Sequence, residues 1–228
     1  MDKIRARSAK GFIATEADVA RGAKALRRAC PIMARIHAVA GDPPLRRQPA
    51  GFEGLARIIV GQQLSTASAS AIWGRCGATI SPFSVASILQ ASDDELRGCG
   101  LSRPKVRTLR AVAGAVADGG LDIEGLERAS DDEVHAALTS VSGIGPWTAD
   151  VYVMFCLGRA DAFAAGDLAL QIAAQHAAGL DTRPSPAELL TLAERWRPWR
   201  AVAALMLWAY YPHIKKQRPA AADSGQPL

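Results

Sequence analysis

The chain has 228 residues, of which 49% are hydrophobic and 21% charged, with a formal net charge of +5. This composition is ordinary for a soluble globular protein of one large domain or two packed lobes, and the basic balance suits a nucleic-acid partner without proving one. The four cysteines are scattered and include no CxxC pair, which argues against a disulfide framework or a zinc site. The longest apolar run, residues 201–211, is too short to cross a membrane.

The first third of the chain predicts helices separated by clear breaks. Residues 1–14 are basic and aperiodic, which predicts a flexible tail with no signal peptide and a cytoplasmic location. Apolar residues at helical spacing predict a helix from about residue 16 to 40, ended by Gly41-Asp42-Pro43-Pro44. Two more helices are predicted over about 52–64 and 66–80.

Two later segments begin with the same helix-capping phrase. Ser92-Asp93-Asp94-Glu95 and Ser130-Asp131-Asp132-Glu133 both fit the S-x-x-E capping box. A vestige of duplication and two independent helix starts explain the repeat equally well. Further helices are predicted over 109–117 and from 198 to about 211, the last of them apolar nearly all round and therefore buried. No alternating strand pattern occurs, so the predicted fold is all-α.

Between two of these helical patterns lies the glycine-rich segment Ser142-Gly143-Ile144-Gly145-Pro146. Both glycines permit positive φ, and proline suits the first turn of the helix that follows. A helix that opens in this way points main-chain N–H groups outward, and DNA phosphate is the obvious anion for them. Residues 111–190 carry three basic and twelve acidic groups, whereas residues 1–50 carry eleven basic and four acidic. Main-chain donors, with Lys and Arg from other segments, are therefore expected to hold the phosphate.

Three motifs give the chain a family resemblance. They are the LxxVxGIGPWTA segment at 138–149 with a lone Asp167 about twenty residues later, Ile59-Val60-Gly61-Gln62-Gln63-Leu64-Ser65, and Glu194-Arg195-Trp196-Arg197-Pro198-Trp199-Arg200. In this order they resemble the helix-hairpin-helix (HhH-GPD) DNA glycosylases over roughly residues 52–212. Within that superfamily, the bacterial 3-methyladenine DNA glycosylase II (AlkA-like) type without its extra N-terminal β domain is the nearest pattern.

The resemblance implies a two-lobed helical fold with the active site in the cleft between the lobes. The first lobe would combine residues 15–48 and 162–216, the second would span 49–161, and 217–228 would form a disordered tail. The implied activity is hydrolysis of the N-glycosidic bond of alkylated purines in double-stranded DNA, the first step of base excision repair, by a monomer. Some relatives in this superfamily hold an iron–sulfur cluster on closely spaced C-terminal cysteines, and no cysteine follows Cys156 here, so no cluster is expected. The resemblance is compatible with a monovalent cation at the hairpin.

Asp167 matches the catalytic aspartate of the family. A fixed carboxylate stabilises the positive charge that builds on the deoxyribose as the base departs. The alternative is that Asp167 only caps the helix beginning at Leu168, and the two roles are compatible.

Trp147 stands where bifunctional relatives carry a lysine that forms a Schiff base, so hydrolysis without strand cleavage is expected. By resemblance, Trp147 and Trp208 line the base pocket, with Tyr152 a weaker candidate because the usual pocket tyrosine position is Val151 here. Aromatic faces stack well on a purine that carries an alkyl-induced positive charge.

The same resemblance assigns the DNA contacts. Gly143, Ile144, Gly145 and Thr148 would form the DNA-binding hairpin. Gln63, with Gln62 beside it, would fill the gap left by the flipped nucleotide and contact the orphan base. The alternative is that the two glutamines are merely polar residues at a helix end. Arg103 and Lys105 are expected to contact phosphates, although such side chains are often only solvated.

Two rival functions remain at this point. One is a catalytically inert helix-hairpin-helix DNA-binding protein, in which Asp167 caps a helix and does nothing else. The other is a glycosylase of the same fold for another damaged or mismatched base, against which the missing lysine and cluster cysteines argue.

Overall fold

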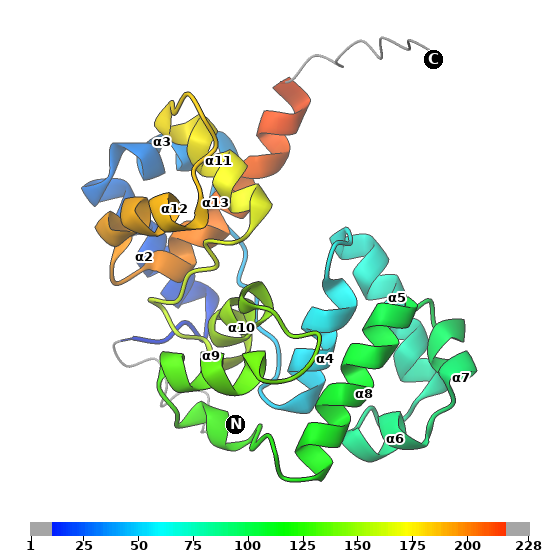
Figure 1. Cartoon of the computed structure of the whole chain (residues 1–228). Coiled ribbons are helices and arrows are strands. Elements are labelled where there is room, and N and C mark those ends of the chain that lie inside the picture. The colour runs from blue at the N-terminus through cyan, green and yellow to red at the C-terminus, as the bar shows by residue number, and fades with distance from the viewer. Residues whose placement is uncertain (1–10, 218–228) are drawn as a thin grey trace. The chain divides into compact units, whose positions relative to one another are not determined.

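The computed structural model describes residues 11–217 and contains helices without a β-sheet in that range (Figure 1). This confirms the predicted all-α fold. The helices form two compact units. Unit 1 consists of the described residues up to Leu45 together with those from Phe163 onward, and unit 2 consists of Arg46–Ala162. None of the helices in the described range has the length and apolar character that a membrane span requires.

Unit 1 is built around its last helix, α13. Its elements are α2 (Glu16–Ala29), α3 (Pro31–Ala40), α11 (Leu168–Ala178), α12 (Pro186–Ala193), η4 (Glu194–Trp196) and α13 (Arg200–Gln217). α13 packs against α2, α3 and α11. A Cβ atom on Gly22 of α2 would lie 2.7 Å from the Val202 side chain, so the close approach of α2 to α13 requires glycine there. Trp196 is fully buried, with its ring 5.8 Å from that of Phe163.

The single helix predicted over 16–40 is wrong: the chain breaks at Cys30. Cys30 has extended backbone angles, φ −137° and ψ 114°, and Pro31 opens α3 as its first residue. Proline lacks the N–H that a continuous helix needs and disfavours helical angles in the residue before it. The last helix also runs further than predicted, to Gln217, and includes Pro212.

The flexible tail predicted over residues 1–14 is wrong for Ile13 and Ala14, which are ordered against the rest of the protein. Ile13 is buried, and the Ala14 N–H donates to the Asp18 carboxylate at 3.0 Å. Thr15 and Asp18 form a capping box that starts α2. Residues 1–10, and residues 218–228 of the predicted C-terminal tail, lie outside the described residues.

Unit 2 is organised around α8. Its elements are α4 (Phe52–Gly61), α5 (Thr66–Thr79), α6 (Val85–Gln90), α7 (Asp93–Gly98), α8 (Arg103–Ala117), η2 (Gly125–Glu127), α9 (Asp131–Thr139), α10 (Pro146–Tyr152) and η3 (Val153–Leu157), the last a π-helical turn. α8 packs against α4, α6 and α7. It begins six residues before the predicted start at Leu109, because Pro104 falls in its first turn, where proline is tolerated. The two predicted capping boxes, Ser92 with Glu95 and Ser130 with Glu133, are both formed.

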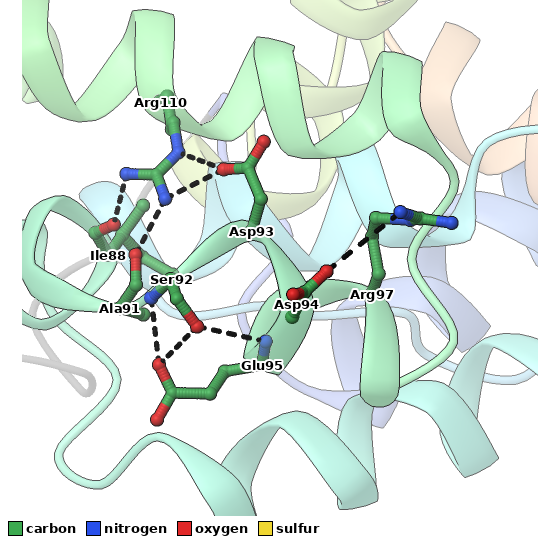
Figure 2. A network of polar contacts seen from close by, with 8 residues as sticks. All are labelled: Ile88, Ala91, Ser92, Asp93, Asp94, Glu95, Arg97 and Arg110. Carbon is green, nitrogen blue, oxygen red and sulfur yellow. Dashed lines mark hydrogen bonds and ion pairs between the residues drawn. The ribbon is translucent and has the colours of Figure 1, made fainter.

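The guanidinium group of Arg110 on α8 forms hydrogen bonds to the end of α6 and the start of α7. Figure 2 shows this group donating to the main-chain oxygens of Ile88, at 3.2 Å, and Ala91, at 2.6 Å. It also bonds the Asp93 carboxylate at the start of α7. Carbonyls at the end of a helix lack intrahelical partners, so a cation there satisfies them and complements the helix dipole. A cation on α8 thus caps α6.

Candidate functional site

Asp167 is the N-cap residue of α11. Its Oδ1 atom accepts a hydrogen bond from the Leu170 N–H at 3.0 Å. The same oxygen accepts from the indole Nε1–H of Trp208 at 3.2 Å. The carboxyl group is thereby fixed by one main-chain donor and one side-chain donor from α13. The capping interpretation of Asp167 is confirmed, and Trp208, a predicted pocket residue, lies in contact with the predicted catalytic acid.

The predicted hairpin lies between α9 and α10. Gly143 has φ +88°, and a Cβ atom there would lie 2.2 Å from Thr108 Oγ1 of α8. Glycine is therefore required at this position, by its backbone angle and by the close approach of α8. The turn closes with a hydrogen bond from the Ile144 N–H to the Val141 carbonyl, at 3.1 Å.

Gly145 differs from Gly143. Its φ is −98°, so it does not use the positive φ that glycine permits, and an added Cβ would meet no atom within 4 Å. Neither backbone strain nor internal packing accounts for glycine at this position. The N–H groups of Gly143 and Gly145 have no hydrogen-bond acceptor among the described residues, although the Gly145 carbonyl accepts from Thr148 and Ala149. The hairpin therefore leaves main-chain donors and an unobstructed surface for a ligand.

Two predicted hairpin contacts need correction. The side chain of Ile144 is 6% exposed and that of Thr148 is 2% exposed, so both pack inside unit 2. Thr148 Oγ1 accepts a hydrogen bond from Gln62 Nε2 at 2.8 Å. Any contact of these two residues with a ligand would have to be through the main chain.

Gln62 and Gln63 form the corners of a tight turn at the end of α4. The Leu64 N–H donates to the Gly61 carbonyl at 3.2 Å, Gln62 has φ −53° and ψ 131°, and Gln63 has φ +57°. These are the angles of a type II β-turn, which ordinarily has glycine at its third position. Gln63 is exposed and is the only residue other than glycine with positive φ in the described chain, whereas Gln62 is tied to Thr148.

The two predicted phosphate contacts have different surroundings. Arg103 is exposed at the first position of α8, and no hydrogen bond or ion pair engages it within residues 11–217. Lys105 is half-buried, and its Nζ donates to the carbonyls of Val60, at 2.7 Å, and Gln62, at 2.9 Å. Burial lowers the pKa of Lys105. Lys105 thus caps the end of α4, and its prediction as a phosphate contact is not supported.

The two remaining aromatic candidates also differ. Trp147 is the second residue of α10 and is half-buried. Tyr152 is 0% exposed, and its hydroxyl accepts from the Gly51 N–H at 3.0 Å. Burial raises the pKa of Tyr152 well above its usual range. A side chain with no exposed face cannot stack on a base, so the assignment of Tyr152 to the pocket is corrected to a core role.

His135 and Asp150 form a polar contact that no motif pointed to. His135 Nε2 lies 3.2 Å from Asp150 Oδ1, which joins α9 to α10 on either side of the hairpin. Burial raises the pKa of Asp150 to about 6, although the neighbouring His135 opposes that rise. No group of three or more His, Cys, Asp or Glu side chains within residues 11–217 could hold a metal ion.

The sequence pattern singled out Asp167, Trp208 and the hairpin glycines as candidates, but it did not predict the long-range contacts found among the candidate residues. The bond from Trp208 to Asp167 spans 41 residues, and the bonds from Lys105 to α4 span 45 and 43. Nothing in the local pattern around Lys105 distinguishes it from a solvated lysine. The left-handed angle of Gln63 was equally invisible, because glutamine is not a residue that signals such a conformation.

Comparison with known proteins identifies the family. Residues 56–198 match the family model described as "HhH-GPD superfamily base excision DNA repair protein". Among curated proteins, the chain is 32% identical over 161 residues to DNA-3-methyladenine glycosylase 1 of Schizosaccharomyces pombe, covering 69% of this chain and 71% of that one. It is 33% identical over 201 residues to the probable bifunctional transcriptional activator/DNA repair enzyme AlkA of Mycobacterium tuberculosis, covering 81% of this chain but only 39% of that protein.

Solved structures agree with the sequence matches. The 3-methyladenine DNA glycosylase Mag1 of Schizosaccharomyces pombe, in complex with abasic DNA, superposes with a TM-score of 0.74 at 28% identity, covering 82% of this chain and 95% of that one. A DNA-3-methyladenine glycosidase from Bacillus halodurans gives a TM-score of 0.69 at 32% identity, covering 84% and 89%. The chain therefore belongs to the HhH-GPD superfamily of base excision DNA repair proteins.

Proposed function

We propose that the protein is a monofunctional DNA glycosylase that hydrolyses the N-glycosidic bond of alkylated purines, of the 3-methyladenine and 7-methylguanine type, in double-stranded DNA. Family membership and the names of its relatives support excision of alkylated bases as the first step of base excision repair. The observation that carries the proposal is the Asp167 carboxylate, fixed by donors from Leu170 and Trp208.

In the proposed reaction, the bond between C1′ of the deoxyribose and the purine nitrogen breaks, and the base departs with the electron pair. The Asp167 carboxylate stabilises the positive charge that develops on the sugar. Water then adds to C1′ and loses a proton, which leaves an abasic site. A purine that bears an alkyl-induced positive charge leaves as a neutral molecule, so the site needs no acid to protonate it.

DNA is held by main-chain groups in this proposal. The Gly143 and Gly145 N–H groups of the hairpin receive a backbone phosphate, and the exposed Arg103 at the start of α8 is the proposed cationic contact. The exposed Gln63 enters the gap left by the extruded nucleotide. Trp208, beside Asp167, supplies aromatic surface for the flipped base, and Trp147 is proposed for the same role.

Strand cleavage is not part of the proposed activity. A lyase of this superfamily needs an amine that can form a Schiff base with the sugar. The position that would supply it carries Trp147, and the α10 sequence PWTADVY contains no lysine. A strand nick at the abasic site, formed without added base or lyase, would contradict this part of the proposal.

Three broader features of the protein are also proposed. We infer that the protein acts as a monomer and that its location is the cytoplasm, in keeping with its membership of a family of DNA repair proteins. A monovalent cation at the hairpin is also compatible with the motif. Size-exclusion chromatography with light scattering tests the first of these, and each of them leaves the catalytic proposal unchanged if it fails.

The test is base release from methylated duplex DNA by the wild-type protein and by Asp167→Asn. Asparagine caps a helix as well as aspartate does, so the variant keeps the start of α11 and loses only the charge. We expect single-turnover release of methylated purines to fall about 10²- to 10³-fold, with affinity for an abasic-site duplex changed less than about threefold. No release by either protein would favour the inert DNA-binding module, whereas equal release by both would show that Asp167 is not the catalytic group.

A further inference from the structure

The type II turn at the end of α4 is an unfavourable conformation for its own sequence. A type I turn and a type II turn differ mainly by a flip of the central peptide, here the one that joins Gln62 to Gln63. In the type I form Gln63 would have negative φ, as residues other than glycine prefer. The observed φ of +57° at Gln63 therefore has to be enforced by contacts outside the turn.

Lys105 provides such a contact at the peptide that decides the turn type. Its Nζ donates to the Gln62 carbonyl at 2.9 Å, and this oxygen belongs to the peptide that would flip. A second bond, to the Val60 carbonyl at 2.7 Å, anchors the ammonium group to the end of α4. A flip to type I would rotate the Gln62 oxygen away from Nζ and break a hydrogen bond between a charged donor and a carbonyl, which is among the stronger kinds.

A second contact fixes the other corner of the turn. Gln62 Nε2 donates to Thr148 Oγ1 at 2.8 Å, and Thr148 is a buried residue of α10. α8 also meets the hairpin directly, since Thr108, one turn after Lys105, lies beneath Gly143. One face of α8 thus bears on both the turn and the hairpin. All of these groups belong to unit 2.

We infer that Lys105 is a positioning residue: by holding the Gln62 carbonyl it keeps the turn in its type II form, which presents the Gln63 side chain to the gap in the flipped-out duplex. This inference rests on the wedge role given to Gln63 in the proposed function. It replaces the expectation that Lys105 contacts a phosphate. Lys105 acts through Gln63 and touches neither the base nor the reacting sugar.

A double-mutant cycle tests this coupling. The proteins of the cycle are wild type, Lys105→Met, Gln63→Ala and the double variant. Arg107 is an exposed arginine on the same helix, so Arg107→Met is the matched control for loss of a positive charge. The measurements are single-turnover base release from methylated duplex DNA and the Kd for a duplex with a tetrahydrofuran abasic site. Lys105→Arg, which keeps the cation, provides a conservative rescue if Lys105→Met folds poorly.

We expect Lys105→Met and Gln63→Ala each to lower release about tenfold, and the double variant to fall no further than the lower of the two. Lys105→Arg should recover part of the loss. The dependence of log Kd on log salt concentration should be the same for Lys105→Met as for the wild type, because no phosphate contact is lost. Arg107→Met should keep wild-type release.

The outcomes separate the inference from the function on which it rests. The inference is overturned if the two losses of activity multiply in the double variant, because Lys105 then acts independently of Gln63. It is also overturned if Lys105→Met makes the dependence of log Kd on log salt concentration shallower by about one released ion, because Lys105 then contacts DNA. In both cases the inference fails and the glycosylase proposal stands. The same holds if Gln63→Ala loses activity and Lys105→Met does not. If Gln63→Ala releases bases as fast as the wild type, the wedge role itself fails.

Discussion

Gln63 has an exposed side chain and a strained backbone. The strain lowers the stability of the protein, whereas the side chain serves the proposed wedge role. A left-handed conformation costs glutamine on the order of 1 kcal/mol, whereas glycine adopts it freely. We predict that Gln63→Gly raises the free energy of unfolding by about 0.5–1 kcal/mol and lowers base release about tenfold. Gln63→Ala is the matched control: it should lose the same activity without gaining stability. Urea unfolding of the three proteins checks this, and equal stability of the Gly and Ala variants would show that the turn is unstrained.

Asp150 gives the stability of unit 2 a pH dependence of unusual sign. Burial raises its pKa to about 6 in the folded protein, above the usual value of 3.8. A raised pKa means that the folded state binds the proton more tightly, so this contribution to stability is present below about pH 4 and is lost as the pH rises through 6. The hydrogen-bonded capping carboxylates, such as Glu133, have lowered pKa values and change stability in the opposite direction.

The variant Asp150→Asn isolates this effect. Relative to the wild type, it should gain stability between pH 4 and pH 7, by about 1–2 kcal/mol after allowance for partial exposure and the lost contact with His135. Thermal unfolding at both pH values measures the change. A constant difference between the two proteins across this range would show that Asp150 does not titrate there.

At the scale of elements, the two glycines of the hairpin perform different tasks. Gly143→Ala places a Cβ against Thr108 and requires φ +88°, so it should cost at least about 2 kcal/mol of stability. Gly145→Ala meets no atom and keeps an ordinary φ, so it should cost only about 0.5–1 kcal/mol as a weaker helix cap. Both should bind an abasic-site duplex about tenfold more weakly. Unfolding and binding measured on the same preparations test the pair, and tight binding by Gly145→Ala would exclude a close approach of phosphate at that position.

The sequence predicted those elements whose signals are local. The capping boxes at Ser92 and Ser130, the hairpin glycines and the N-cap at Asp167 are all determined within about one helical turn, and all are present. The break at Cys30 was missed because the apolar spacing runs on through Pro31, although proline at a first helical position was the available signal. The caps made by Lys105 and Arg110 could not have been foreseen, because each joins α8 to the end of a helix that precedes it in the chain.

At the scale of the whole molecule, the proposed machinery is divided between the units. Asp167 and Trp208 belong to unit 1, whereas the hairpin, the Gln63 turn and Arg103 belong to unit 2. The segment that contains the hairpin is also strongly acidic, with twelve acidic and three basic groups over residues 111–190. A grip by main-chain N–H groups suits this arrangement, since it does not depend on net charge. Most of the affinity contributed by the hairpin should then be insensitive to salt.

Variants of Arg103 and Gly145 can separate the cationic phosphate contacts from those made by main-chain N–H groups. Each phosphate neutralised by a cation contributes about −0.9 to the slope of log binding constant against log salt concentration on duplex DNA. We predict that Arg103→Met weakens binding to an abasic-site duplex and makes the slope shallower by about that amount. Gly145→Ala should weaken binding by a similar factor with the slope unchanged, because a main-chain donor releases no counterion. Fluorescence anisotropy titrations from 50 to 200 mM salt, a range over which counterion release changes affinity strongly, distinguish the two. A shallower slope for Gly145→Ala, or an unchanged slope for Arg103→Met, would mean that the phosphate contacts are distributed otherwise than proposed.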